Sequence, residues 1–69
     1  MNDFDNAQLF KCIVEQGSLA KAAKAFNINP SAVSKRLSQL EHSLQTQLIN
    51  RTTRRISLTE AGHYFYSKV

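Results

Sequence analysis

A turn and the start of a helix are encoded by residues 27–37, which read NINPSAVSKRL. Asn29 is a residue type that commonly caps helix N-termini, and Pro30 at the first helical position loses no hydrogen bond. Apolar residues then recur at helical spacing and form one stripe, consisting of Val33, Leu37, Leu40 and Leu44. This pattern predicts a helix that begins at Pro30 and runs to about Thr46.

The face of this helix opposite the apolar stripe is polar and basic. At about 100° per residue, the side chains between about 140° and 200° from Val33 are those of Ser31, Lys35, Ser38 and His42. Ser34 falls at about 100°. Serine permits a close approach and hydrogen bonding, and lysine can donate to guanine O6 or N7. This face therefore suits the edges of bases in a major groove.

A shorter helix is predicted directly before the turn, over residues 18–26. Ser18 reads as its N-cap, and Asn27, a residue type that tolerates positive φ, reads as its terminating residue. Lys21 and Lys24 point away from its apolar face, which consists of Leu19, Ala22, Ala23 and Phe26. Two helices joined by so short a turn form a helix-turn-helix, in which the second helix enters the major groove of DNA.

The N-terminal segment predicts one more helix, from about Asp5 to Gln16. Asp3 or Asp5 can cap its start, and Gly17 supplies a left-handed C-cap. Its apolar face consists of Leu9, Phe10, Ile13 and Val14. These residues add a third helix to the predicted core.

The periodicity changes after the third helix in the chain. Residues 48–51 and 55–58 are short β-compatible runs separated by residues 52–54, which predicts a two-stranded hairpin with a basic tip. Thr59 then caps a fourth helix, and Glu60 adds favourable negative charge to its first turn. This last pattern has no stop signal, so we expect the sequence to be a fragment of something longer.

Together these elements predict a mainly α-helical winged helix-turn-helix, with a three-helix core, a short two-stranded β wing and a C-terminal linker helix. We expect residues 1–59 to form this domain, with the helix-turn-helix at about 18–37 and the wing at about 48–58. Residues 60–69 would begin a linker or dimerisation helix.

The predicted contacts with DNA come from three places. Free backbone N–H groups at residues 30–33 and the start of the second helix suit phosphate oxygens. The wing would lie along phosphates, and one of its arginines can enter a narrow minor groove. The residues expected to bind DNA are Ser18, Asn29, Pro30, Ser31, Ser34, Lys35, Ser38, Arg51, Thr53 and Arg54.

The charge distribution also indicates a polyanionic ligand. The net charge is +4 in 69 residues, but residues 20–58 carry seven Lys and Arg against one Glu, a net +6, whereas residues 1–19 carry −2. A basic region in a small domain is typical of nucleic-acid binding.

Length and composition exclude several other classes. A chain of 69 residues has room for one small domain, and the single cysteine, Cys12, excludes an internal disulfide. No Cys/His cluster has ligand spacing, so we expect no metal and no cofactor. No apolar run reaches the roughly 20 residues that span a bilayer, and there is no secretory leader, which indicates a cytoplasmic protein without a membrane partner.

Five motifs in order give the sequence a family resemblance. They are Gly17-Ser18-Leu19-Ala20-Lys21-Ala22-Ala23, Pro30-Ser31-Ala32-Val33-Ser34-Lys35, Leu40-Glu41, Leu48 with Arg51, and Leu58-Thr59-Glu60-Ala61-Gly62. Their order and spacing over residues 4–69 resemble the N-terminal DNA-binding domain of LysR-type transcriptional regulators.

The resemblance implies sequence-specific binding of double-stranded DNA by a transcriptional regulator. It implies that Ser31, Ser34 and Lys35 face bases and that Arg54, at the wing tip, reaches the minor groove. It also implies a homodimer or higher oligomer paired through the fourth helix. A small-molecule effector would bind only to a C-terminal domain that lies beyond Val69.

The sequence departs from the family pattern at three places. Gln45 stands where Gly is usual, so the third helix is expected to run on or to end less sharply. Ile49 replaces a common Phe, which gives a smaller apolar residue beneath the wing. Pro30-Ser31 replaces the more frequent Gln-Pro pair, which implies a different sequence preference.

Two alternatives from other classes are weighed against DNA binding. Winged helices also serve as protein-interaction modules, because a fold does not fix a function. An enzyme is disfavoured, because residues 18–21 match an S-x-x-K acylation motif by letters only and no nucleophile–base–orienter set accompanies them.

Several side chains are open to more than one interpretation. Cys12 is interpreted as a small buried hydrophobe rather than a redox sensor. His42 and His63 are interpreted as exposed surface residues. The aromatic residues 64–66 fit either the core or a dimer face.

Overall fold

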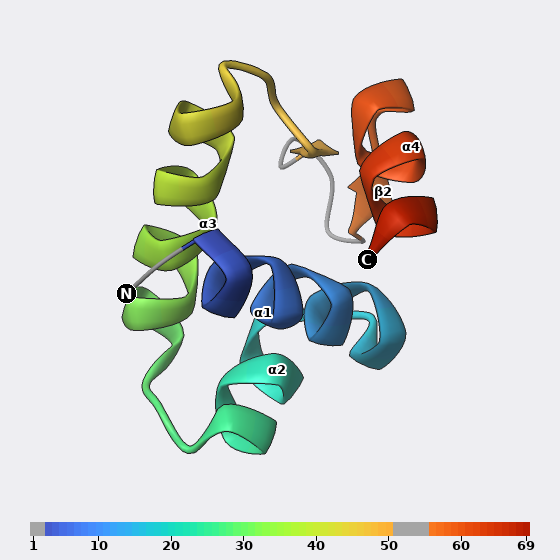
Figure 1. The fold of residues 1–69 in the computed structure, drawn as a ribbon. Helices are drawn as coiled ribbons and strands as arrows, with labels where there is room; N and C mark the ends of the chain where they lie inside the picture. Colours follow the sequence, from blue (N-terminus) through green and yellow to red (C-terminus); the bar gives the residue numbers. More distant parts are fainter. Residues whose placement is uncertain (1–2, 51–55) are drawn as a thin grey trace.

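The computed structural model describes residues 3–50 and 56–69. Its elements in chain order are α1 (Asp3–Gln16), α2 (Leu19–Phe26), α3 (Pro30–Leu44), β1 (Ile49–Asn50), β2 (Ser57–Leu58) and α4 (Glu60–Lys68). Figure 1 shows α1 across the middle of the molecule, with α3 on one side and α4 on the other. The mainly helical winged helix-turn-helix expected from the sequence is confirmed.

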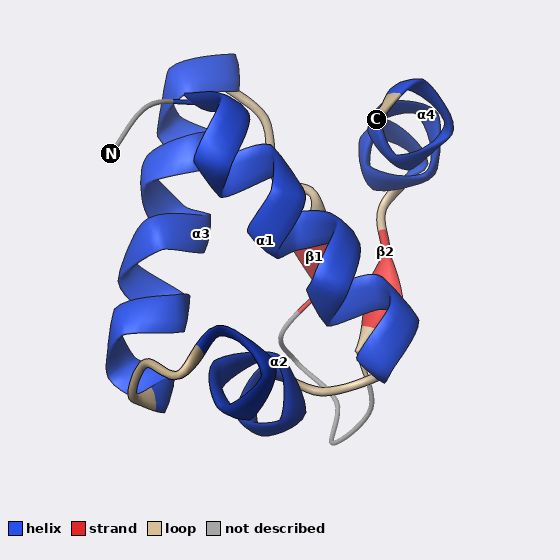
Figure 2. Cartoon of the chain, turned by 60° about the horizontal axis from the view of Figure 1, so that its bottom comes forward, coloured by secondary structure: helices blue, strands red, loops and turns tan. Residues whose placement is uncertain are grey.

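One apolar core joins the first three helices to β1. Its buried members are Leu9, Phe10, Ile13, Ala22, Ala23, Val33, Leu37, Leu40, Leu48 and Ile49. The predicted apolar faces of α2 and α3 therefore meet α1, and small alanines on α2 permit the close approach of its neighbours. In Figure 2, α2 and α3 lie next to each other on the same side of α1, and each contacts it.

The predicted N-caps are confirmed at three helices. The Ser18 hydroxyl accepts the Lys21 N–H at 3.0 Å, and the Asn29 side-chain oxygen accepts the Ala32 N–H at 2.9 Å. The Thr59 hydroxyl accepts the Gly62 N–H at 2.9 Å. Each cap satisfies one of the N–H groups that a helix start leaves without an intrahelical partner.

Two predicted helix ends are also confirmed. Gly17 and Asn27 take the left-handed conformation, with φ of 81° and 56°. After α2, the Ile28 N–H bonds to the Ala23 carbonyl at 3.0 Å and the Asn27 N–H to the Lys24 carbonyl at 3.2 Å. This pair of bonds is a Schellman motif, which ends α2 sharply and turns the chain toward α3.

The expectations for the end of α3 are wrong. The helix stops at Leu44, because Gln45 adopts the left-handed conformation that glycine usually supplies, with φ of 54°. The Thr46 N–H bonds to the Glu41 carbonyl at 3.1 Å and completes a second Schellman motif. Leu44, expected in the apolar stripe, is 39% exposed, since the chain leaves the core at this turn.

The start of α1 also differs from the prediction. The helix already includes Asp3, so both Asp3 and Asp5 lie within it instead of preceding it as a cap. The negative charge of Asp5 lies near the start of the helix, where it interacts favourably with the helix dipole.

Strands β1 and β2 pair antiparallel, with Ile49 opposite Leu58 and Asn50 opposite Ser57. The Glu41 carboxylate of α3 accepts the N–H groups of Leu48 and Ile49, at 2.8 and 3.2 Å. This contact fixes where the wing leaves the end of α3. Ile49 is buried beneath the wing, as predicted.

Helix α4 packs closely on the base of the wing. A Cβ added to Gly62 would collide with the Leu48 carbonyl, so only glycine permits this approach. The Phe65 ring meets Phe10 edge-on, with 5.6 Å between ring centroids, and the Tyr66 hydroxyl donates to Glu15 at 3.4 Å. Phe65 and Tyr66 therefore belong to the core side of α4, whereas Tyr64 is 67% exposed.

Candidate nucleic-acid interface

The exposed face of α3 consists of the residues that the helical periodicity predicted. Pro30, Ser31, Lys35 and Ser38 are all exposed, and Ser34 is half-buried. Val33, Leu37 and Leu40 hold the opposite face in the core. The first half of α3 therefore presents short polar groups and one lysine on a rigid support, which a base-reading helix requires.

Asn29 organises the start of this face. Its side-chain oxygen accepts the Ser31 hydroxyl at 2.7 Å as well as the Ala32 N–H. Because the Ser31 hydroxyl hydrogen is directed at Asn29, the lone pairs of its oxygen are oriented toward outside donors. In this arrangement Ser31 acts as an acceptor at the exposed end of the helix.

The expectation of several free N–H groups in the first turn of α3 needs correction. Pro30 has no N–H, and the Asn29 carbonyl accepts the N–H groups of Ala32 and Val33 at 3.1 and 3.3 Å. At most the Ser31 N–H is left for an outside anion. The dipole of α3 still favours negative charge here, but the cap has used most of the donors.

Ser18 lies at the corresponding start of α2. Its oxygen is already engaged by the Lys21 N–H, which leaves its hydroxyl hydrogen to donate outward. Ser18 is half-buried, and Lys21 and Lys24 of the same helix are exposed. Helix α2 therefore offers one donor at its start, with Lys21 nearby, and a second positive charge, Lys24, in its last turn.

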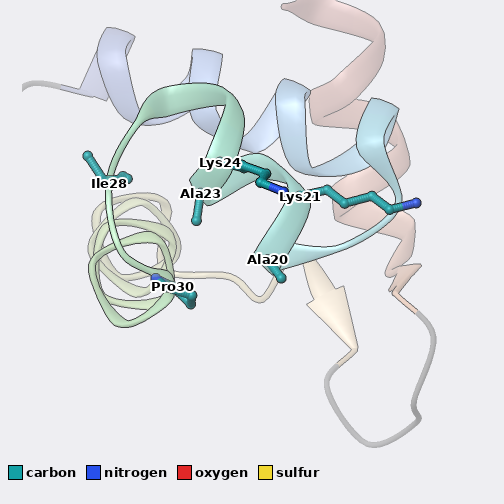
Figure 3. A pocket seen from close by; sticks show the side chains of 6 residues that line it. All are labelled: Ala20, Lys21, Ala23, Lys24, Ile28 and Pro30. Carbon is teal, nitrogen blue, oxygen red and sulfur yellow. The ribbon is translucent and has the colours of Figure 1, made fainter.

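A shallow open groove runs between α2 and the start of α3 (Figure 3). It was not expected from the sequence. Its floor is apolar, and two lysines flank it; the lining residues are Ala20, Lys21, Ala23, Lys24, Ile28 and Pro30. The i, i+3 and i+4 spacing of residues 20, 23 and 24 signals one helix face, but only the tertiary structure brings Pro30 beside it.

Arg36 does not belong to the exposed basic surface that the charge distribution suggested. Its side chain is 9% exposed and turns toward α1 and α2. At about 100° per residue, Arg36 lies within about 60° of the Val33 position, so the helical wheel itself carried this signal. The basic charge available to a ligand on α3 is therefore that of Lys35.

Three of the residues expected to bind DNA belong to the predicted wing. Arg51, Thr53 and Arg54 lie outside the described residues.

Among residues 3–50 and 56–69, no group of His, Cys, Asp and Glu could hold a metal ion, and no helix is long and apolar enough to span a membrane. Burial, with the nearby Glu15 carboxylate, raises the pKa of the half-buried Cys12 thiol, which keeps it protonated and unreactive near neutral pH.

Comparison with known proteins decides the family. The family model for bacterial regulatory helix-turn-helix proteins of the lysR family matches residues 4–63. The chain belongs to the LysR family. A LysR-family relative from Escherichia coli K12, the HTH-type transcriptional activator AaeR, is 41% identical over 66 residues, which cover 96% of this chain and 21% of that protein. An uncharacterized HTH-type transcriptional regulator from Haemophilus influenzae is 41% identical over 68 residues, 99% of this chain and 24% of that protein.

Solved structures of LysR-type proteins share the fold. The full-length Vibrio cholerae virulence activator AphB has a TM-score of 0.89 and 39% identity over 97% of this chain and 23% of that one. The complex of BenM_DBD with catB site 1 DNA has a TM-score of 0.90 and 32% identity over 99% of this chain and 74% of that one. The chain thus spans about a fifth to a quarter of these full-length regulators, and about three quarters of the isolated domain.

Proposed function

We propose that this chain binds double-stranded DNA in a sequence-specific manner as part of a transcriptional regulator, with α3 in the major groove. One observation carries the proposal. The N-terminal half of α3 exposes Pro30, Ser31 and Lys35 while its other face is locked in the core. The DNA complexes of BenM_DBD and CbnR_DBD, with TM-scores of 0.90 and 0.89, support it as structural relatives.

The proposed contacts divide by the part of DNA they meet. Ser31, Ser34 and Lys35 read base edges, with Ser38 further along the same helix. Ser18, Asn29 and Pro30 lie at the helix starts, where the dipoles attract phosphates. The wing residues Arg51 and Thr53 contact the backbone, and Arg54 enters a minor groove narrowed by A·T pairs.

The wider organisation is part of the same proposal. Residues 1–59 act as the DNA-binding domain, and residues 60–69 begin a linker helix that pairs two subunits. A small-molecule effector would act on a further domain of the longer regulator. The protein works in the cytoplasm, without a cofactor and without enzymatic activity, since its relatives are named as transcriptional regulators.

Selection of binding sites from random duplex DNA tests this proposal. We expect an enriched sequence, and for a dimer two related half-sites about one helical turn, roughly 34 Å, or a multiple of it apart. Affinity for the selected site should also fall steeply with added salt, because bound lysines and arginines release counterions. No enrichment, together with salt-insensitive binding, would favour a protein-interaction module instead.

A further inference from the structure

Arg36 is the one basic side chain among residues 30–38 of α3 that the proposed reading face does not use. It directly follows Ser34 and Lys35 in the chain but points the other way. Its Nε donates to the Oδ1 of Asn6 on α1 at 3.0 Å, and its Cζ lies 5.9 Å from the ring centroid of Phe26 at the end of α2. One side chain of α3 therefore contacts both other helices of the core.

This contact is shielded from water at both ends. Asn6 is 3% exposed and Arg36 is 9% exposed. Among the described residues, no buried side-chain nitrogen or oxygen lacks a partner, so the arginine and the asparagine are matched to each other and their surroundings. A charge-assisted hydrogen bond is directional and strong in such a setting, whereas the leucine contacts around it are not directional.

We infer that Arg36 is a positioning residue for DNA reading, which fixes the rotation of α3 about its own axis through Asn6 and Phe26. A rotation of about 20° would move side-chain atoms at the helix surface, about 5–6 Å from the axis, by about 2 Å. Such a shift breaks a hydrogen bond to a base edge, because donor–acceptor distances vary by only about 0.5 Å. The apolar contacts of Val33, Leu37 and Leu40 hold α3 in the core, but they are not directional, so they set its rotation less sharply than a hydrogen bond does.

The inference rests on the proposed function, and it separates specificity from stability. Replacing both members of a buried polar pair with apolar residues of similar size often leaves the free energy of unfolding unchanged. Such a variant can therefore stay folded and still lose the geometric restraint on α3. The double variant Asn6→Leu/Arg36→Met therefore keeps a packed core but removes the directional contact. Asn6→Asp keeps an acceptor oxygen and serves as the conservative variant.

The test compares affinity for the selected site with affinity for a random duplex at one salt concentration, after far-UV circular dichroism has shown each variant folded. We expect the double variant to lose about tenfold in the ratio of these affinities. For Asn6→Asp, this affinity ratio should stay within about twofold of the wild-type ratio. The same is expected of Phe65→Leu, a core variant on the α4 side that controls for lost stability. Arg36→Lys, which keeps the charge but lacks the Nε–H group, provides a second variant with the same expected loss should the double variant unfold.

Two results would overturn the inference while leaving the proposed function intact. One is an unchanged affinity ratio in the folded double variant or in Arg36→Lys. The other concerns random DNA: the slope of log affinity against log salt concentration would fall in the double variant by the amount that one phosphate contact contributes. That result would mean that Arg36 binds the DNA backbone. A wild-type domain that shows no preference for any site would instead remove the proposed function, and the inference with it.

Discussion

The helix-turn-helix, residues 18–44, and the segment from residue 48 to residue 69 are held together by different means. In the first, apolar side chains repeat at helical spacing and pack into a continuous core with α1. In the second, Leu48, Ile49 and Phe65 also reach this core, but a few polar or close backbone contacts set the geometry. They are Glu41 on the N–H groups of Leu48 and Ile49, Thr59 on the Gln47 carbonyl, and Gly62 against the Leu48 carbonyl.

The two kinds of contact have different consequences for stability and for the placement of the wing. Packing gives the helix-turn-helix its stability, and it leaves the outer face of α3 open for contacts with a ligand. The polar contacts add less stability, but each one sets the position at which the wing and α4 join the core. Substitutions of core side chains should therefore lower global stability most, and those at the contacts around the wing should cost less stability and also change the placement of the wing.

The largest effect is expected at Leu37, in the packed region. Leu37→Ala leaves a cavity beneath α3 and should lower the free energy of unfolding by about 2–5 kcal/mol, a large share of the stability of so small a domain. Urea denaturation followed by far-UV circular dichroism measures this. Gln39→Ala, on the exposed side of the same helix, should stay within about 0.5 kcal/mol of the wild type.

A smaller loss is expected at Gly62, where α4 meets the wing. Gly62→Ala places a methyl group against the Leu48 carbonyl, and the forced shift should cost about 1–3 kcal/mol of stability. The neighbouring exposed variant His63→Ala is the control. Equal stability of the two variants in a thermal melt would show that α4 does not pack as closely as described.

Glu41→Ala should cost about 1–2 kcal/mol, because it leaves the N–H groups of Leu48 and Ile49 without their acceptor. Amide hydrogen exchange locates the effect: exchange at residues 48 and 49 should accelerate more than exchange within α3. Glu41→Gln keeps one acceptor oxygen, so its free energy of unfolding should lie between those of Glu41→Ala and the wild type. Uniform acceleration across the domain would contradict a local anchoring role.

The smallest effect is a gain of stability at the end of α3. Gln45→Gly removes the steric cost of the left-handed conformation and should raise the free energy of unfolding by about 0.5–1 kcal/mol. Asn27→Gly, at the equivalent end of α2, should gain less, because Asn tolerates this conformation better than Gln. Chemical denaturation of the two variants side by side tests the ranking.

Local signals were sufficient to predict the first region. The caps at Ser18 and Asn29, the left-handed residue Asn27, and the apolar positions 33, 37 and 40 of α3 each act over a few residues, and all were confirmed, whereas Leu44 is exposed. The exposed positions of Ser31 and Lys35 follow from the same periodicity. The change from helical spacing to short β-compatible runs after the third helix predicted the two-stranded wing.

What the sequence did not predict depends on contacts between distant residues. The helical wheel places Arg36 near the core face, but its partner Asn6 lies 30 residues away, and the groove beside Pro30 requires the packing of α2 on α3. The sharp end at Gln45 was missed because an αL glutamine is intrinsically unfavourable and is stabilised here by the Schellman bonds around it. For Arg36 and the groove the missing information was tertiary, whereas for Gln45 a local capping motif outweighed the intrinsic preference of the residue.

The central claim is that the exposed face of α3, and not basic charge in general, binds DNA specifically. The most direct measurement compares Lys35→Ala with Lys68→Ala, since each removes one exposed positive charge and Lys68 lies on α4. For a site selected from random DNA, Lys35→Ala should weaken binding by about 1–3 kcal/mol, with a smaller loss on non-specific DNA. Lys68→Ala should leave affinity for that site nearly unchanged, and equal losses from the two variants would contradict the account.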